Sequence, residues 1–521
     1  MFIDLNAYAG PADIETDVCI VGAGAAGITL ALELNDTGKD VCVLESGGFD
    51  YDAATQSLAD GDNIGIPYYP LIASRLRFFG GTTNHWGGIS TPMDELDFQE
   101  REGIPYSGWP ITRASLDPWY ERANEYCKLG PYNYDPNSWA EPDAPVLLDD
   151  GGRVGTTMCL EKPVRFGQVY REQMNASRNI QVFLSANVTE LEARENGASV
   201  ARAHVQTLNG KRLIVSARTF VVATGAVENA RLLLASRKVQ TDGLGNDRGL
   251  VGRFFMEHPL FPAMELQLSS KEANLALYTG RSGEELLYKG YWALAPETTK
   301  RERILSAKAS LTIGGLEQRA AKALKGVSAA IFIWNAMKEG HLPPDFGRHV
   351  QNLLSDLHRV TIYSYERAFL RSPSTASITV QLEQAPNPDS RITLSDELDR
   401  LGMQKVQLDW RMGDLERRSV VRFGELLGME IGRAGIGRAR LVEQSANGWW
   451  TGTRGAWHQM GTTRMHSDPT QGVVDANCRV HGIDNLYMAG GSVFSTAGSA
   501  NPTLTMVALA ARLAEHLKGL P

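Results

Sequence analysis

The feature that most constrains the fold of this chain is a glycine-rich turn between two short apolar segments near the N-terminus. The segment Asp17 to Val21 has the composition of a buried strand, and the turn Gly22 to Gly27 (GAGAAG) follows it directly. Helical spacing over Ile28 to Leu34 and a second apolar run, Val41 to Leu44, complete a βαβ unit that ends in Glu45. Glycines here let the backbone approach a pyrophosphate, and a carboxylate after the second strand can accept hydrogen bonds from ribose hydroxyls. The unit therefore predicts a dinucleotide-binding domain, against the alternative of a glycine-rich turn without a ligand.

The stretch from Trp457 to Leu517 joins a histidine to the start of a helix. His458 lies near its beginning, and Asn501 immediately precedes Pro502, a residue type favoured in the first turn of a helix. The free N–H groups at such a helix start favour nearby negative charge, such as the charge on the pyrimidine edge of a reduced flavin ring. We therefore expect a base, His458, beside a flavin. The alternative for Asn501 is that it serves only as an N-cap.

A second glycine-rich loop, Phe79 to Gly88 (FGGTTNHWGG), is a further candidate for contact with the flavin. This composition is poor for helices and strands, so the loop predicts a backbone that approaches another group closely. Three interpretations of His85 are open: a covalent tether to the methyl group on the flavin's benzenoid ring, a hydrogen-bond donor to the cofactor, or a packed loop histidine.

Composition disfavours several other classes of protein. Hydrophobic residues make up 43% and charged residues 21% of the 521 positions, and the net charge of -8 gives no reason to expect a nucleic-acid partner. No run approaches the roughly 18 apolar residues of a membrane span, and the first residues lack a signal-peptide pattern. We therefore expect a soluble, cytoplasmic protein without membrane contact. The cysteines form no CxxC pair, so we expect neither a metal site nor a disulfide framework; they are Cys19, Cys42, Cys127, Cys159 and Cys478.

In their order and spacing, the motifs resemble those of the glucose-methanol-choline (GMC) oxidoreductase family. The resemblance is carried by GAGAAG with Glu45, the GGTTNHWGG loop, GAVENARLLLAS at Gly225 to Ser236, FMEHP at Phe255 to Pro259, and the C-terminal block. The HW loop, a histidine shortly before GTTRM and the terminal ANPTLT are most similar to the branch of pyranose 2-oxidases and glycoside 3-oxidases or 3-dehydrogenases. The resemblance implies an FAD cofactor and an enzyme that oxidises alcohols.

Carried over to this chain, the resemblance makes His458 the catalytic histidine and Asn501 its partner. His85 matches the histidine that holds covalent FAD in pyranose oxidases, but Asn84 and Gly87 depart from its usual neighbours, so a covalent link stays open. The complete predicted FAD site is Gly22, Gly24, Ala26, Gly27, Glu45, Gly81, Thr82, Thr83, Asn84, His85, Trp86, Gly87, Gly88, Val188, Ala223, Gly490, Gly491, Asn501, Pro502 and Thr503.

The expected fold class is α/β, with a Rossmann-like FAD-binding domain that is discontinuous in sequence and an α+β substrate-binding domain built on an antiparallel sheet. We expect residues 1–255 to form the first part of the FAD domain, with a loop excursion over about 50–155. Residues 256–440 then form the substrate domain, and 441–521 the C-terminal part of the FAD domain. The patterns behind this division are late strands over Val200 to Ser216 and Thr219 to Ala223, middle strands over Ile378 to Leu382, Arg391 to Leu394 and Gln404 to Asp409, and a helix over Leu415 to Ile431.

Alcohol oxidation needs a group that takes the hydroxyl proton while hydride leaves carbon for flavin N5. A neutral imidazole, with an ordinary pKa of about 6.5, suits this role near neutral pH, which favours His458. The amide of Asn501 can hydrogen-bond the same hydroxyl and fix its position.

The remaining polar candidates carry weaker signals. Gln384 and Asp389 lie in a polar loop suited to polyol hydroxyls, with a solvated turn as the alternative. His258 in FMEHP either lies near the active site or belongs to a turn before Pro259. We interpret His466 and His481 as loop residues, not metal ligands.

The sequence thus predicts FAD-dependent oxidation of a secondary ring hydroxyl of a sugar or glycoside, at C2 or C3, to a ketone. Two alternatives stay open. One is a GMC enzyme for a non-sugar alcohol or for an aminocyclitol or aminoglycoside biosynthetic intermediate, and the other is a flavin electron carrier without alcohol chemistry. The sequence leaves undecided whether O2 or another acceptor takes the electrons, and whether the protein forms a homo-oligomer.

Overall fold

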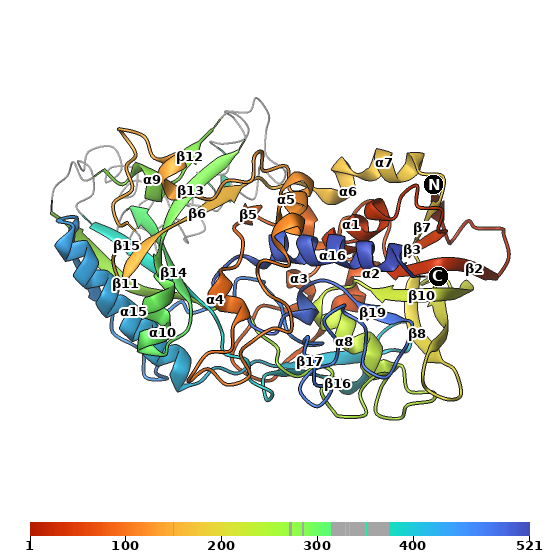
Figure 1. Ribbon diagram of the computed structural model, residues 1–521. Helices are drawn as coiled ribbons and strands as arrows, with labels where there is room; N and C mark the ends of the chain where they lie inside the picture. Colours follow the sequence, from red (N-terminus) through yellow and green to blue (C-terminus); the bar gives the residue numbers. More distant parts are fainter. Residues whose placement is uncertain are drawn as a thin grey trace.

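The computed structural model consists of two lobes, each built around a large sheet (Figure 1). It describes residues 1–149, 151–269, 274–283, 286–313 and 375–520, together with the single positions 329, 333, 350 and 351. One lobe contains both the N-terminal strands and the C-terminal helix, and the other contains the long helix α15 (Asp414–Arg433) on its outer side (Figure 1). The mixed α/β class expected from the sequence is confirmed.

The first sheet is mainly parallel and is assembled from distant parts of the chain. Its order is β1-β7-β3-β2-β10-β9-β8, with β19 pairing on β10. The strands are β1 (Phe2–Asp4), β2 (Asp13–Val21), β3 (Val41–Leu44), β7 (Ile180–Leu184), β8 (Asn187–Ala193), β9 (Val200–Gln206), β10 (Arg212–Val222) and β19 (Leu486–Met488). The central strands are buried on both faces, which explains why DVCIV, VCVL and TFVV read as continuous apolar runs.

One strand of this sheet differs from the expected division. The sequence predicts a break between Ser216 and Thr219, whereas β10 (Arg212–Val222) runs straight through. Its first half pairs antiparallel with β9, while the strand from Ile214 to Val222 pairs parallel with β2 (Asp13–Val21). The apolar pattern therefore changes along one strand because its neighbours change, and no turn separates the two halves.

The second sheet is antiparallel and has the order β18-β11-β15-β14-β13-β6-β5, with β12 pairing on β13. Helix α15 packs against it. Its strands β5 and β6 precede residue 255, so the expected boundary there does not separate the two sheets. The strands are β5 (Ile89–Ser90), β6 (Val154–Glu161), β11 (Leu260–Leu268), β12 (Arg281–Ser282), β13 (Leu287–Leu294), β14 (Ala307–Ile313), β15 (Thr375–Leu382) and β18 (Gly437–Leu441).

A third, small sheet contains two strands that we expected in the substrate domain. β16 (Arg391–Leu398) and β17 (Gln404–Asp409) pair with β4 (Gly61–Asn63) in the order β16-β17-β4. Both β16 and β17 pack on helix α8 (Ala226–Ala235), which follows β10 of the first sheet. Periodicity identified the strands correctly but could not show which sheet they join.

The helix that follows the glycine-rich turn, α1 (Ala25–Glu33), packs against α16 (Pro502–Lys518), near the C-terminus. Figure 1 shows these segments side by side in red and blue. The other helices of the described ranges are α2 (Ala53–Gln56), α3 (Leu71–Ser74), α4 (Glu95–Phe98), α5 (Asp117–Tyr126), α6 (Phe166–Val169), α7 (Arg171–Ala176), α9 (Ala276–Thr279) and α10 (Pro296–Glu302). Short 3-10 helices are η1 (Ser57–Ala59), η2 (Gly81–Asn84), η3 (Pro136–Trp139) and η4 (Gly491–Val493).

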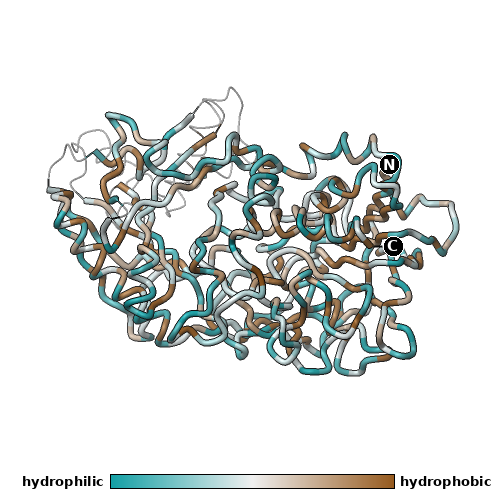
Figure 2. The backbone as a smooth tube through the Cα atoms, viewed as in Figure 1, coloured by the Kyte–Doolittle hydropathy of each residue, from teal (hydrophilic) through white to brown (hydrophobic). Residues whose placement is uncertain are grey.

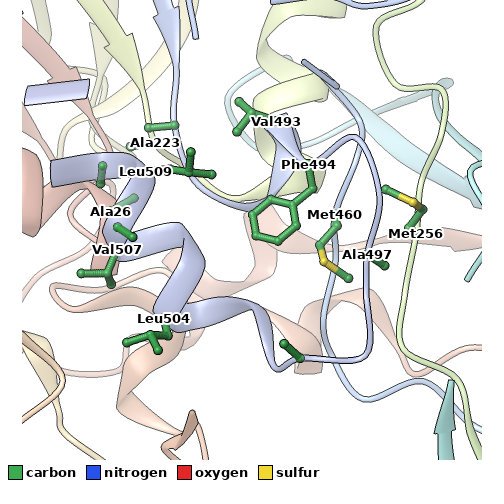
Figure 3. Close-up of a cluster of buried hydrophobic side chains, with 14 of the residues drawn as sticks. Ala26, Ala223, Met256, Met460, Val493, Phe494, Ala497, Leu504, Val507 and Leu509 are labelled. Atoms are coloured by element: carbon green, nitrogen blue, oxygen red, sulfur yellow. The ribbon is translucent and has the colours of Figure 1, made fainter. Parts of the chain in front are cut away.

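One apolar core joins the two lobes. It includes Val221 of the first sheet and Val380 of the second, and apolar segments lie inside both lobes in Figure 2. Figure 3 shows part of it, where Val507 of α16 lies near Ala26 and Met460 lies near Phe494 and Met256. Among the helices of the described ranges, none is long and apolar enough to cross a membrane.

Candidate active site

A cavity of about 600 Å³ runs from the glycine-rich turn after β2 to the segment that carries His458. Every residue of the predicted FAD site lines it except Gly27 and Asn84, and both predicted catalytic residues, His458 and Asn501, line it as well. Its volume falls within the range of about 300–1,000 Å³ that is usual for ligand pockets. The structure therefore brings two ends of the chain into one cavity.

At one end of the cavity, two glycines meet requirements that no larger residue satisfies. Gly22 has φ +100°, and a Cβ on Gly27 would lie 1.9 Å from the carbonyl oxygen of Gly22. A Cβ on Gly24 would meet nothing within 4 Å, since this residue faces the cavity. Helix α1 starts here without a side-chain cap, so backbone N–H groups are available to a phosphate.

Glu45 lies at the same end and is 5% exposed. Its carboxylate accepts hydrogen bonds from the backbone N–H groups of Ala23 and Gly47, each at 3.0 Å. Burial raises the pKa of this carboxyl, and these hydrogen bonds oppose the rise. A carboxylate on the cavity wall beside the glycine turn suits the ribose hydroxyls of a dinucleotide. Together with the glycines, it makes this end fit the adenosine half of FAD.

The loop after Phe79 forms η2 (Gly81–Asn84) and then the cavity wall around His85 and Trp86. Asn84 turns away from the cavity and donates hydrogen bonds to the carbonyl oxygens of Phe79 and Gly81, each at 3.0 Å. Its role in the described structure is therefore to brace the loop, which explains why it does not line the cavity.

His85 leaves one ring nitrogen unused. Its Nε2 is buried and has no hydrogen-bond partner among the described residues. The ring stacks on Trp457, with centroids 5.1 Å apart. Burial, and then the charge of Arg165, lowers the pKa of His85, so the imidazole is neutral at pH 7. An unsatisfied nitrogen in a cavity wall fits contact with a group that the described residues do not supply.

At the opposite end, two histidines from distant segments face each other. Met256 and Met460 form an antiparallel bridge, with both backbone hydrogen bonds at 2.9 Å. In that antiparallel register His258, two positions after Met256, is opposite His458, two positions before Met460, and their Nδ1 atoms are 2.9 Å apart. His258 thus lies against His458, the predicted base, and is not only part of a turn before Pro259.

The hydrogen bonds of this pair define the tautomers. His258 Nε2 lies 2.8 Å from the carbonyl oxygen of Gly498, which can only accept, so this nitrogen carries a proton. Burial, and then the charge of Lys308, lowers the pKa of His258 to about 4, so its Nδ1 is unprotonated near pH 7. His458 must then donate from Nδ1, which leaves the lone pair of its Nε2 free. Burial, followed by His258 and Lys308, also holds the pKa of His458 well below its ordinary value.

Asn501 completes this end of the cavity. Its Nδ2 lies 3.4 Å from His458 Nε2, and its Oδ1 accepts a hydrogen bond of 2.7 Å from Lys308 Nζ. Asn501 occupies the N-cap position of α16, but its side chain makes no capping hydrogen bond. The cap alternative therefore explains its position in the helix but not the direction of its amide.

Glu257, beside His258 in FMEHP, anchors the backbone of both histidines. Its Oε1 accepts from the N–H groups of His258 at 2.8 Å and His458 at 2.7 Å, while Tyr68 donates to Oε2 at 2.5 Å. Burial raises the pKa of Glu257 to about 7 against the effect of these hydrogen bonds. Trp457, the residue before His458, has φ +63°, and the hydrogen bond from the His458 N–H to Glu257 helps to maintain this conformation. Sequence reasoning missed Glu257, Tyr68 and Lys308; only the adjacency of Glu257 to His258 offered a signal.

The two residues predicted to contact substrate lie elsewhere. Gln384 is fully buried, and its side chain accepts from Glu257 N and Trp410 Nε1 and donates to the carbonyl oxygen of Arg411. Asp389 is exposed, 3.7 Å from Arg253. Neither residue lines the cavity, because Gln384 packs against the segment of Glu257 and Asp389 faces solvent.

The two remaining candidate histidines, His466 and His481, make hydrogen bonds with residues of the same or a neighbouring loop. Nδ1 of His466 accepts from the N–H of Asp468 at 2.9 Å, and Nε2 of His481 donates to the carbonyl oxygen of His466 at 2.9 Å. Over the described residues, no group of three metal-ligating side chains comes together.

Comparison with known proteins adds independent findings. A family model described as FAD dependent oxidoreductase matches residues 17–242, and one described as GMC oxidoreductase matches residues 386–510. The chain is 26% identical to 6'''-hydroxyparomomycin C oxidase of Streptomyces lividus, over 98% of this chain and 93% of that protein. It is 33% identical to C-glycoside 3-oxidase of Microbacterium trichothecenolyticum, over 24% of each chain.

Solved structures support the fold. A formate oxidase superposes with a TM-score of 0.56 at 18% identity, covering 98% of this chain and 99% of that one. A pyridoxine 4-oxidase from Mesorbium loti gives a TM-score of 0.57 at 18% identity, with coverage of 96% and 99%. At these identities the likeness concerns the architecture alone.

Proposed function

We propose that this chain is an FAD-dependent oxidoreductase of the GMC type that oxidises a secondary ring hydroxyl of a sugar or glycoside, at C2 or C3, to a ketone. The observation that carries the proposal is the free Nε2 of His458 beside Asn501, in the same cavity as the dinucleotide turn. A base and an amide so arranged suit removal of a hydroxyl proton.

The proposed base acts through the lone pair that the neighbouring histidine leaves free. His258 accepts the Nδ1 proton of His458, so His458 Nε2 is the atom that takes the proton of the substrate hydroxyl. Its distance of 3.4 Å from Asn501 Nδ2 is long for a hydrogen bond, and a hydroxyl oxygen can accept from that amide instead. Asn501 then holds the hydroxyl oxygen while His458 removes its proton.

The bound FAD supplies the acceptor for the hydride that leaves the carbon. Gly22, Gly24 and Glu45 would hold its adenosine and pyrophosphate, and the wall around His85 its ring system. His85 is the residue that would carry a covalent link, since its Nε2 is buried and unused.

A ring-shaped substrate is supported by the aromatic wall at the histidine end. Trp457 is 38% exposed, and Tyr69 meets it edge to face at 5.3 Å. Both line the cavity beside His458. Exposed aromatic faces at a cavity wall give apolar contact to a sugar ring and leave its hydroxyls to polar neighbours. Gln381 and Arg454, which also line this end, supply such neighbours and replace Gln384 and Asp389 in the proposal.

A second candidate substrate is an aminoglycoside hydroxyl, which the names of the relatives favour: 6'''-hydroxyparomomycin C oxidase and, at 24% identity, paromamine 6'-oxidase of Streptomyces fradiae. Charge separates the two candidates. The carboxylates among the described cavity residues, Glu45 and Glu228, lie with the dinucleotide turn and Arg75, whereas the histidine end carries Arg454. A polycationic substrate gains no carboxylate among the described residues that line the histidine end, since the Glu257 carboxylate beside His458 is not part of the lining and is taken up by backbone N–H groups and Tyr68, so we favour a neutral glycoside.

The test is anaerobic mixing of the purified yellow protein with separate panels of sugars, O- and C-glycosides, aminoglycosides and simple alcohols. Bleaching of the flavin absorbance by sugars or glycosides is the expected result, and readmitted air then shows whether O2 accepts the electrons. Bleaching by aminoglycosides alone, or by simple alcohols alone, would show that the substrate belongs to that class and not to the neutral glycosides. A flavin that no alcohol bleaches would support the electron-carrier alternative, which gives no reason for the His458 and Asn501 pair.

A further inference from the structure

Lys308 of β14 (Ala307–Ile313) is a buried ammonium group beside the proposed reaction centre. Its residue is 1% exposed. Nζ donates to Asn501 Oδ1 at 2.7 Å and lies 3.6 Å from Cys159 Sγ and 5.1 Å from the centroid of the Tyr291 ring. Among the residues that the structure describes, no carboxylate lies within 4 Å of this nitrogen.

This environment is an expensive one for a lysine. Lysine is almost never fully buried unless it is paired, because moving an ammonium group out of water is costly even after the protein relaxes around it. One amide oxygen and one ring face compensate only part of that penalty. A buried cation without a carboxylate is expected where an anion forms during a reaction.

The contact with Asn501 fixes the direction of an amide whose two ends differ. The ammonium can only donate, so it selects Oδ1, and Nδ2 is left to face His458 Nε2 at 3.4 Å. Reversed, the amide would present an oxygen to His458 and could not donate to the substrate. The same loop is held by Gln381, which pairs with Lys308 across β14 and β15 and donates to the carbonyl oxygen of Ser499 at 3.0 Å.

We propose that Lys308 is a positioning residue for alcohol oxidation: it orients the Asn501 amide toward the substrate hydroxyl and provides a fixed positive charge near the oxygen that loses its proton. The inference rests on the proposed function, since it assumes that a hydroxyl binds between Asn501 and His458. Lys308 acts through Asn501 and need not touch the substrate.

The charge also acts on the base. The titratable groups that face His458 from the described elements are Glu257, His258 and Lys308. Burial is the main reason for the low pKa of His458, and the positive charge of Lys308 contributes to it. Removing that charge therefore raises the pKa of His458. The acidic limb of the pH profile for flavin reduction must then move to higher pH, an effect that a purely structural lysine would not have.

The experiment compares Lys308→Met, Lys308→Gln and Lys289→Met with the unmodified holoenzyme. Lys289 is a matched control, because its Nζ lies 5.3 Å from the same Tyr291 ring but donates to the carbonyl oxygen of Leu311 at 3.3 Å. FAD content, the substrate Kd and the limiting rate of anaerobic flavin reduction are measured across pH, with whichever alcohol reduces the unmodified enzyme.

We expect Lys308→Met to keep FAD and to lower the limiting rate about 100-fold, the loss typical for removal of one preorganised electrostatic group. Substrate Kd changes little, and the acidic limb moves to higher pH. Lys308→Gln keeps a hydrogen-bond donor to Asn501 but loses the charge. Its limiting rate should therefore lie between those of Lys308→Met and the unmodified enzyme, and the acidic limb of its pH profile should move as far as in Lys308→Met. Lys289→Met matches the unmodified enzyme.

A rate and pH limb in Lys308→Met equal to those of the unmodified enzyme would overturn the inference. If Lys308→Met loses FAD, Lys308→Gln decides the matter, and loss of FAD in both variants would make Lys308 structural and overturn it too. Failure of sugars to reduce the unmodified enzyme contradicts only the proposed substrate, because any other alcohol that reduces it serves in this test. An enzyme that no alcohol reduces contradicts both proposals.

Discussion

The two ends of the cavity are built in different ways. The dinucleotide end is made mostly from backbone, within one continuous motif that begins at Gly22 and closes at Glu45. The histidine end is made from side chains of separate segments, with His258, Lys308, His458 and Asn501 each on a different one. The first end depends on local sterics and the second on the register between distant strands. We therefore expect that cofactor binding and alcohol oxidation can be damaged separately by mutation in this protein.

The strongest test of that separation is His458→Ala. Loss of the base should lower the rate of flavin reduction on the order of 1,000-fold, within the range for general-base catalysis. FAD content should remain that of the unmodified protein, since the dinucleotide end is untouched. Anaerobic stopped-flow absorbance measures the rate. His466→Ala is the control, because His466 bonds within its own loop; equal rates in both variants would show that His458 is not the base.

The reverse test damages the backbone end through Gly27→Ala. The new Cβ would lie 1.9 Å from the carbonyl oxygen of Gly22, so the turn must shift. Overpacking of this kind costs about 1–3 kcal/mol, which corresponds to weakening of FAD binding by up to about 100-fold. Titration of the apoprotein with FAD measures it. Gly432→Ala on α15, where a Cβ meets nothing within 4 Å, should bind FAD normally; equal affinities would contradict the proposed turn.

At the histidine end, Asn501→Asp separates catalysis from helix capping. Aspartate is an N-cap residue as favourable as asparagine and still accepts from Lys308, so the melting temperature should hold. A carboxylate oxygen replaces the Nδ2 donor, and flavin reduction should slow about 10- to 100-fold through lost orientation of the hydroxyl. A native rate in this variant would leave Asn501 with a structural role only.

The pH dependence follows from the same arrangement. Burial, His258 and Lys308 hold the pKa of His458 well below its ordinary value, so the base stays neutral as the pH falls through about 6.5. The limiting rate of flavin reduction should be constant from neutral pH down to that value and decline only at lower pH, as His458 gains its proton. Stopped-flow rates in a pH series measure it; an acidic limb at or above about 6.5 would contradict the assignment of the base.

The smallest expected effect concerns His85, which lies between the two ends. We expect a covalent link at this residue, so the yellow colour should stay with acid-precipitated protein and move to the supernatant in His85→Ala. The rate of flavin reduction should change less than tenfold, because His85 is not part of the proton transfer. Colour released from the unmodified protein would exclude the link and leave His85 as a cofactor contact.

The same contrast explains what the sequence could predict. The βαβ unit was predictable because β2, α1 and β3 follow one another and each requirement is local. The family resemblance predicted that His458 and Asn501 act together, and the structure brings both to one cavity. The position of Lys308 beside them was not predictable, since a lysine between Ala307 and Ala309 gives no sign that its strand will lie beside the C-terminal loop. Gln384 was predicted to contact substrate, but its side chain accepts hydrogen bonds from Glu257 and Trp410. These partners are distant in sequence, and only the tertiary structure brings them near.

The packing of α16 on α1 has a consequence for the order in which the protein comes into being. During synthesis the glycine-rich turn emerges early, but α16 and the glycines after β19, Gly490 and Gly491, which line the same cavity, follow every other large element of the described chain. A growing chain therefore contains the glycine-rich turn before it contains the C-terminal residues that line the same cavity. We therefore expect cofactor uptake to follow the synthesis of α16, and a chain that stops short of α16 to retain FAD poorly.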